Sequence, residues 1–146
     1  RGDLKLVEPE NLHICLKFLG DVPDEKIPQI SKIMRETASN FRAFDIKIAG
    51  IGGFPDSRRP RLIWAAAKAD FNLQPFLDQK LSEIGFPAEK RGFTAHITLA
   101  RVRSGRVDLP EVEDLGMFTA NEIRLKMSQL TPKGPIYTTV ESAILK

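Results

Sequence analysis

A short pattern that occurs twice is the feature that most constrains the fold of this chain. Residues 13–16 and 96–99 both read His-Ile-x-Leu, where x is Cys15 in the first copy and Thr98 in the second, and they contain the only two histidines. Apolar and polar residues alternate in both copies, which is typical of a half-buried strand. Because side chains alternate across a strand, each copy presents an imidazole and a small polar group on one face. The fold must therefore accommodate two similar strands.

The remaining periodicity predicts further strands and two helices. Helices are expected over residues 24–40, with Asp24 or a neighbour as the cap, and over residues 71–84, with Gly85 just beyond the end. Strands are expected over residues 12–18, 44–51, 62–65, 94–102, 122–128 and 136–145. This order of elements, with short connections, predicts an α+β domain with an antiparallel sheet. No Pro/Gly/Ser-rich linker divides the chain, so residues 1–146 are expected to form a single domain.

Composition narrows the class of protein. A chain of 146 residues that is 42% hydrophobic and 28% charged can bury a sizeable core without a structural metal or disulfide. No apolar run approaches the roughly 20 residues of a membrane helix, and Arg1 and Gly2 do not begin a signal-peptide pattern. The lone Cys15 gives no support for an oxidising compartment. We therefore expect a cytoplasmic protein that does not associate with membranes. Its net charge of +3 permits nucleic acid as a partner without requiring it.

The two histidines are the candidate catalytic residues. A lone histidine on a strand is usually structural. His13 and His96, however, share one sequence context, and a structural role does not explain why the same context occurs twice. With an unperturbed pKa near ~6.5, one imidazole can act as a base while the other acts as an acid near neutral pH, as phosphodiester cleavage requires. Two histidines are too few ligands for a structural zinc site. A weak transition-metal site at His13 and Cys15 stays open, whereas a Cys–His nucleophile is less attractive because the matching residue is Thr98.

Together with their flanks, these motifs resemble a known family, the two-histidine phosphoesterases. Within it the chain is similar to the RNA 2',3'-cyclic phosphodiesterases, also called 2'-5' RNA ligases, whose mark is a duplicated His-x-Thr/Ser-x motif. The resemblance extends over nearly the whole chain and rests on residues 10–13, 16–20, 52–55, 60–64, 96–101 and 130–137.

The resemblance implies two pseudo-symmetric lobes of antiparallel sheet, with outer helices, around a central cleft. His96 would be the proton acceptor and His13 the proton donor in opening a 2',3'-cyclic phosphate to a 2'-phosphomonoester. Thr98 and Cys15 would contact the phosphate oxygens. The family implies no metal and no cofactor, a monomer, and RNA ends or small nucleotides as substrates in RNA processing. Reversible 2'-5' ligation is a further implied activity.

Three other residues are candidates for binding substrate. Arg101 could supply positive charge, although regular strand alternation places it on the side of Ile97, away from His96. Trp64 and Phe54 could stack a base, or could simply pack in the core.

Two departures from the family pattern bear on function. Cys15 stands where the family has Thr or Ser, and a thiol is a poorer hydrogen-bond donor than a hydroxyl. The family's N-terminal strand and helix are also expected to be lacking from this domain. These departures keep open an alternative function, a non-catalytic module that binds RNA or nucleotides on the same fold.

Overall fold

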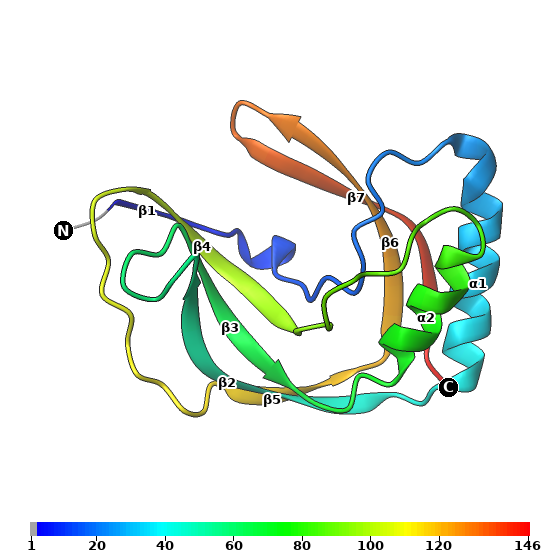
Figure 1. The fold of residues 1–146 in the computed structure, drawn as a ribbon, viewed down its shortest axis with the longest axis horizontal. Coiled ribbons are helices and arrows are strands. Elements are labelled where there is room, and N and C mark those ends of the chain that lie inside the picture. Colours follow the sequence, from blue (N-terminus) through cyan, green and yellow to red (C-terminus); the bar gives the residue numbers. More distant parts are fainter. Residues whose placement is uncertain (1–2) are drawn as a thin grey trace. The chain divides into compact units, whose positions relative to one another are not determined.

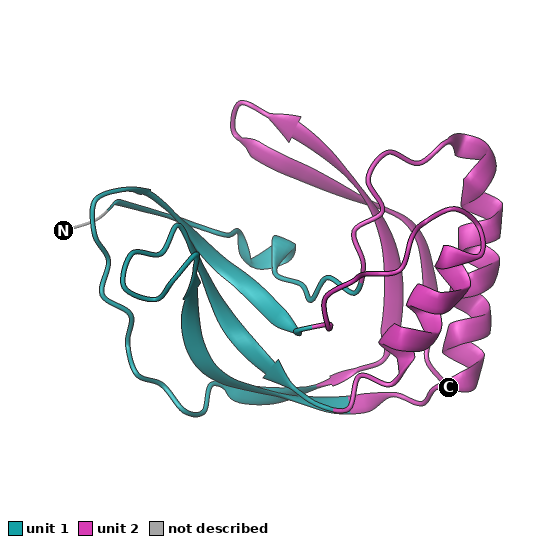
Figure 2. Cartoon of the chain, viewed as in Figure 1, with its two compact units in different colours: residues 1–16, 45–69, 94–118 teal, residues 17–44, 70–93, 119–146 magenta. Residues whose placement is uncertain are grey.

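The computed structural model describes residues 3–146. Arg1 and Gly2, which are not expected to begin a signal peptide, lie outside the described residues. The chain forms two compact units, each assembled from three separate stretches (Figure 2). Unit 1 comprises residues 1–16, 45–69 and 94–118, and unit 2 comprises residues 17–44, 70–93 and 119–146. Among residues 3–146, none of the helices combines the length and apolar character needed to cross a bilayer.

Unit 1 is built on a five-stranded sheet, whose strand order is β1-β4-β3-β2-β5 (Figure 1). The pairs β1–β4, β4–β3 and β3–β2 are all antiparallel. The first residue of β2 and the last two of β5 extend into unit 2. The strands are β1 (Asp3–Leu6), β2 (Phe44–Phe54), β3 (Leu62–Lys68), β4 (His96–Ser104) and β5 (Gly116–Ala120).

One face of this sheet carries the core of unit 1. Ile63 of β3 and Ala100 and Val102 of β4 are buried together. Val107 and Leu109, from the connection between β4 and β5, pack against them. This connection therefore covers one side of the sheet, and the core lies between the two.

Unit 2 contains the helices and a hairpin. A 3-10 turn, η2 (Asp24–Lys26), leads into α1 (Ile27–Asn40), and α2 (Leu73–Ser82) packs against α1. The hairpin consists of β6 (Glu122–Thr131) and β7 (Gly134–Ile144), which pair antiparallel and also contact α1. The buried positions of α1 recur at helical spacing, as the sequence predicted; they are Ile30, Ile33, Met34 and Ala38.

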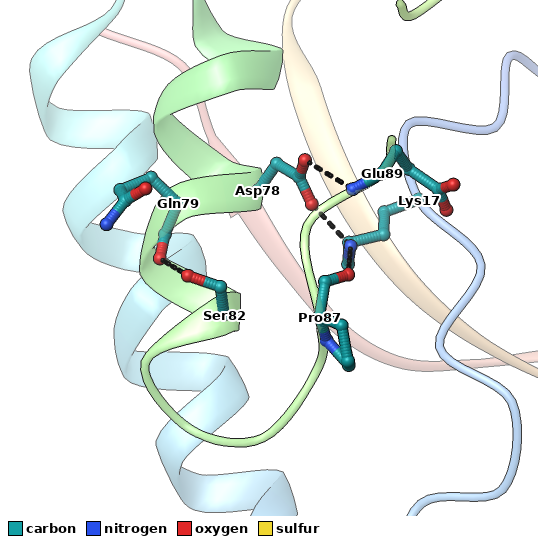
Figure 3. A network of polar contacts seen from close by, with 6 residues as sticks. All are labelled: Lys17, Asp78, Gln79, Ser82, Pro87 and Glu89. Atoms are coloured by element: carbon teal, nitrogen blue, oxygen red, sulfur yellow. Dashed lines mark hydrogen bonds and ion pairs between the residues drawn. The ribbon is translucent and has the colours of Figure 1, made fainter. Parts of the chain in front are cut away.

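A buried ion pair anchors the start of unit 2 (Figure 3). The ammonium group of Lys17 donates a hydrogen bond to Asp78 of α2 and another, at 2.8 Å, to the carbonyl oxygen of Pro87. Asp78 also accepts a hydrogen bond of 3.1 Å from the backbone N–H of Glu89. Only 4% of the Lys17 side chain is exposed. The chain just after the first histidine motif is thus tied to α2 and to the loop that follows it.

Most of the predicted elements are present, and the α+β class with antiparallel strands is confirmed. The strand predicted over residues 12–18 is wrong, because Ile14 forms only an isolated bridge with Ile97. The adjacent edge of β4 is occupied by β1, which was not predicted, and a 3-10 turn, η1 (Pro9–Asn11), separates β1 from this segment. Phe18, expected to face the core, is 78% exposed.

Smaller differences concern element ends and one further strand. The predicted side-chain cap of α1 is absent, since its N-cap residue, Lys26, makes no side-chain capping hydrogen bond. Strand β5 was also not predicted. Gly85 follows the end of α2 with a φ of +102°, which favours glycine, as expected. The arrangement of two lobes around a cleft stays a prediction, as does the single domain.

Candidate active site

His13 lies just after η1, in a segment that pairs with β4 at a single point. Its ring Nδ1 is 2.7 Å from the carbonyl oxygen of Asn11, two residues earlier. A carbonyl oxygen only accepts hydrogen bonds, so Nδ1 must carry the hydrogen. In the neutral ring, the lone pair that can take a proton is therefore on Nε2.

His96 is held in the same way at the first position of β4. Its Nδ1 is 3.0 Å from the carbonyl oxygen of Thr94, again two residues earlier. The two histidines therefore share a tautomer as well as a sequence context, and in both of them Nε2 is the nitrogen that exchanges protons. Both side chains are exposed.

The Ile14–Ile97 bridge brings the two motifs together. It is antiparallel, so residue 13 lies beside residue 98, and residue 15 lies beside residue 96. Directly opposed residues of an antiparallel pair point to the same face, with Cβ atoms about 4.5–5.5 Å apart. Each histidine is thus next to the small polar residue of the other motif. The four polar side chains share one face, which we call the site face.

Trp64 extends the site face onto β3. It pairs with Thr98 across the two strands, and its ring centroid is 6.4 Å from that of His96. On its other side Trp64 pairs with Gly52 of β2. A Cβ atom at residue 52 would lie 2.3 Å from the indole. The Trp64 indole therefore packs closely against Gly52 of β2 and lies next to His96 of β4.

Arg101 also belongs to the site face, so its predicted placement is wrong. Thr98 pairs with Trp64, but Ala100 pairs with Ile63, the preceding residue of β3, so β4 contains one extra residue here. Such a bulge reverses the alternation of the strand beyond it. Ala100 therefore faces the core, and Arg101, paired with Leu62, points to the same face as Thr98. Regular alternation had assigned Arg101 to the opposite side.

Phe54 and a basic loop lie at the edge of this face. Phe54 pairs with Leu62 at the end of β2 and is 60% exposed, so it is not a packed core residue. In the loop that follows, the Asp56 carboxylate accepts backbone hydrogen bonds from Arg58 and Arg59. These bonds, chiefly the one from Arg59, lower the pKa of Asp56 below its ordinary value of 3.8.

Lys5 is a site-face residue that the sequence analysis missed. It pairs with Arg101 across β1 and β4 and therefore points to the same side. The four residues of β1 are too few to give a periodic signal. The predicted site residues are all on this one face of unit 1; they are His13, Cys15, Phe54, Trp64, His96, Thr98 and Arg101.

The structure offers little for a metal centre. Within the described part of the chain, no group of three or more His, Cys, Asp or Glu residues is arranged to hold a metal ion. A hollow of about 460 Å³ in unit 1 is lined by residues 50, 51, 57 and 109–113, none of which is a predicted site residue. The chemistry available on the site face is that of two imidazoles, a hydroxyl, a thiol and cationic side chains.

Comparison with known proteins gives consistent matches. The model of a family described as LigT like Phosphoesterase matches residues 1–64 and 67–137. The RNA 2',3'-cyclic phosphodiesterase of Methanothermobacter thermautotrophicus is 39% identical in an alignment 152 positions long. The alignment covers 96% of this chain and 82% of that protein. The enzyme of the same name from Archaeoglobus fulgidus is 38% identical over 143 residues, which cover 92% of this chain and 80% of that protein.

Solved structures match the fold over almost the same extent. The crystal structure of TT0787 from Thermus thermophilus has a TM-score of 0.89 and 31% identity, and the match covers 97% of this chain and 82% of that one. The crystal structure of Escherichia coli LigT in complex with 3'-AMP has a TM-score of 0.81 and 24% identity, and the match covers 97% of this chain and 81% of that one. The second likeness supports the fold alone.

Proposed function

Because this chain belongs to the LigT-like phosphoesterase family, we propose that it is an RNA 2',3'-cyclic phosphodiesterase. Its substrates would be RNA ends or small nucleotides that carry a 2',3'-cyclic phosphate, and its product a 2'-phosphomonoester. The observation that carries the proposal is the Ile14–Ile97 bridge. In its register His13 is opposite Thr98 and Cys15 is opposite His96, so two imidazoles, a hydroxyl and a thiol belong to one face, which supports the proposed chemistry.

In the proposed reaction, water attacks the phosphorus atom and the bond between phosphorus and O3' breaks. His96 accepts the proton of the water at Nε2, while a protonated His13 gives the proton on its own Nε2 to the departing O3'. The two rings exchange protonation states during the step, and solvent restores them afterwards. The bonds from Nδ1 to the Thr94 and Asn11 carbonyls orient both rings. The assignment of acid and base follows the family resemblance.

The charge on the phosphate is stabilised by the neighbours of the histidines. The Thr98 hydroxyl and the Cys15 thiol donate hydrogen bonds to the non-bridging oxygens. Arg101, on the same face, is available to bind another part of the substrate through its positive charge. The cyclic phosphate already holds its leaving group in place, so positioning and proton transfer suffice, and the scheme uses no metal. If the 5'-hydroxyl of a second RNA replaces the water, the same step forms a 2'-5' linkage.

Base recognition is proposed for the two aromatic residues. The Trp64 indole packs closely against Gly52 and lies beside His96, so it is positioned next to the place where the nucleotide would react. Phe54 is exposed enough to contribute in the same way. Stacking of a base on an aromatic side chain contributes on the order of 1–3 kcal/mol. A monomer in the cytoplasm is the setting that we propose for this activity.

The decisive experiment uses a short RNA that ends in a 2',3'-cyclic phosphate, incubated with the protein in the presence of EDTA. The products are separated so that 2'- and 3'-phosphate ends are distinguished, and His13→Ala and His96→Ala serve as controls. We expect a 2'-phosphate from the unmodified protein and loss of turnover in both variants. Full activity in either variant would overturn the mechanism. RNA binding without turnover would favour the non-catalytic module.

A further inference from the structure

The bulge in β4 creates a pair of cationic side chains beside the histidine site. Arg101 pairs with Lys5 across β1 and β4, and with Leu62 across β3 and β4. Phe54 follows on β2, so these four residues form one row across the site face. Thr98 and Trp64 belong to the next row, together with His13. The cationic row therefore runs parallel to the row that binds the reacting phosphate.

The spacing between the two rows fits the length of one nucleotide. Leu62 of β3 belongs to the cationic row and Trp64 of β3 belongs to the next row. These residues are two positions apart, so the distance between the rows is about 7 Å along the strand. A nucleotide's 5'-phosphate is separated from its own 2',3'-cyclic phosphate by the ribose ring and one exocyclic carbon, a separation of the same order. An anion held by the cationic row can thus belong to the nucleotide whose cyclic phosphate reacts.

The contact that Lys5 makes does not prevent it from binding an anion. Its ammonium group is 3.8 Å from the Glu8 carboxylate, and the two side chains are 49% and 58% exposed. Exposed pairs of this kind contribute little and exchange readily. Arg103 makes a similarly exposed pair with Asp3 and also contacts the Leu4 carbonyl oxygen, but it lies two residues further along β4 from the histidine motif than Arg101. Lys5 and Arg101 are therefore the pair that a phosphate can recruit.

From this geometry we infer that Lys5 and Arg101 form a second anion subsite, which binds the 5'-phosphate of the terminal nucleotide. The inference rests on the proposed function and specifies its substrate class. An RNA end, or a nucleotide with a 5'-phosphate, would be preferred to a nucleoside 2',3'-cyclic phosphate that has a free 5'-hydroxyl. Single-stranded RNA is commonly held through such a combination of cationic and aromatic side chains.

The test compares adenosine 2',3'-cyclic phosphate with and without a 5'-phosphate, measured as the ratio of the two kcat/KM values. We expect the 5'-phosphate to raise kcat/KM by about tenfold, as a charge-assisted contact would. Lys5→Gln should reduce this ratio by about threefold or more. Lys47→Gln, the same substitution on β2 of the same sheet, should leave it unchanged. Added salt should also reduce the ratio in the unmodified protein.

A second measurement separates failure of the subsite from failure of the proposed function. Calorimetry would compare the binding of 5'-AMP and adenosine, which requires no turnover. If both cyclic substrates react equally well, or if Lys5→Gln retains the full ratio, the subsite is overturned and the phosphodiesterase stands. If neither substrate reacts, the proposed function is overturned. In that case the binding data decide. The subsite is supported if 5'-AMP binds more tightly than adenosine and Lys5→Gln removes the difference. The subsite is overturned if 5'-AMP and adenosine bind equally well, or if Lys5→Gln keeps the difference.

Discussion

Gly52 packs against the indole of Trp64 so closely that a side chain at residue 52 would clash with the ring in its present position. A Cβ atom at residue 52 would come within 2.3 Å of one ring carbon and 2.4 Å of another. The indole is a rigid ring rather than the end of a flexible chain, so it must move as a whole to relieve the contact. Because Trp64 also lies beside His96, such a shift would disturb the candidate site.

We therefore predict that Gly52→Ala displaces Trp64. Overpacking of this kind typically costs about 1–3 kcal/mol of unfolding free energy. Trp64 is the only tryptophan, so its fluorescence reports the displacement directly, and urea denaturation measures the cost. Gly92→Ala is the control, since a Cβ at that residue would meet nothing within 4 Å. Equal spectra and stabilities for the two variants would contradict the close packing of Trp64 on Gly52.

A second prediction concerns the thiol on the site face. Cys15 lies beside His96, and Thr98 lies beside His13. A hydroxyl donates a stronger hydrogen bond than a thiol, so Cys15→Thr should raise kcat/KM for an RNA 2',3'-cyclic phosphate. A net hydrogen bond of about 0.5–1.5 kcal/mol corresponds to roughly 2- to 12-fold.

The reciprocal variant provides the matched comparison. Thr98→Cys should lower kcat/KM by a similar factor, because it removes the hydroxyl from the other motif. Steady-state kinetics of both single variants and of the exchanged double variant measure the effect. If neither single variant changes kcat/KM, these two positions do not contact the phosphate as we propose.

The sequence predicted the composition of the site better than its geometry. The two histidine motifs could be recognised because their alternation is local to four residues. The position of Arg101 could not, since the extra residue of β4 appears only when that strand is paired with β3. Regular alternation is the right expectation for an isolated strand, and it fails where a bulge interrupts the ladder.

The first motif illustrates the same limit. Residues 12–18 have a strand-like pattern, yet only Ile14 forms a bridge. A strand needs a partner edge, and β4 begins at His96, so residues 16–18 have no β4 residue opposite them in the register of this bridge. Since β1 has only four residues, neither its presence nor the placement of Lys5 could be inferred from periodicity. The sequence pattern carries no information on which distant segments pair with each other.

The loop beyond Phe54 gives a prediction on pH. The folded-state pKa of Asp56 is lowered because its carboxylate accepts backbone hydrogen bonds, first from Arg59 and then from Arg58. The stabilisation that Asp56 provides is therefore fully present above its unfolded-state pKa, and it is lost as the pH falls through the lower folded-state value. We expect the amide NMR signals of Arg58 and Arg59 to titrate with a midpoint below 3.8. In Asp56→Asn this step should disappear, whereas a midpoint at or above 3.8 would contradict the assignment.

The buried pair of Lys17 and Asp78 gives a prediction on stability. Lys17→Met would leave the Asp78 carboxylate, only 13% exposed, without its counter-charge. It would also remove the hydrogen bond to the Pro87 carbonyl oxygen. Removing one partner of a buried pair typically costs about 3–5 kcal/mol. We expect a loss of that size in the free energy of unfolding, measured by urea denaturation.

Two further variants identify the cause of this loss. In the double variant Lys17→Met with Asp78→Leu, no buried charge is left unpaired, so most of the stability should return, as apolar replacements of buried ion pairs often allow. Lys80→Met, on α2 like Asp78, breaks a pair with Glu36 of α1. The two side chains are 35% and 40% exposed, so this change should cost less than about 1 kcal/mol. If Lys17→Met costs no more than Lys80→Met, burial does not strengthen the Lys17 pair. If the double variant stays as unstable as the single one, the loss comes from the missing hydrogen bonds to the backbone of Pro87 and Glu89 rather than from an unpaired carboxylate.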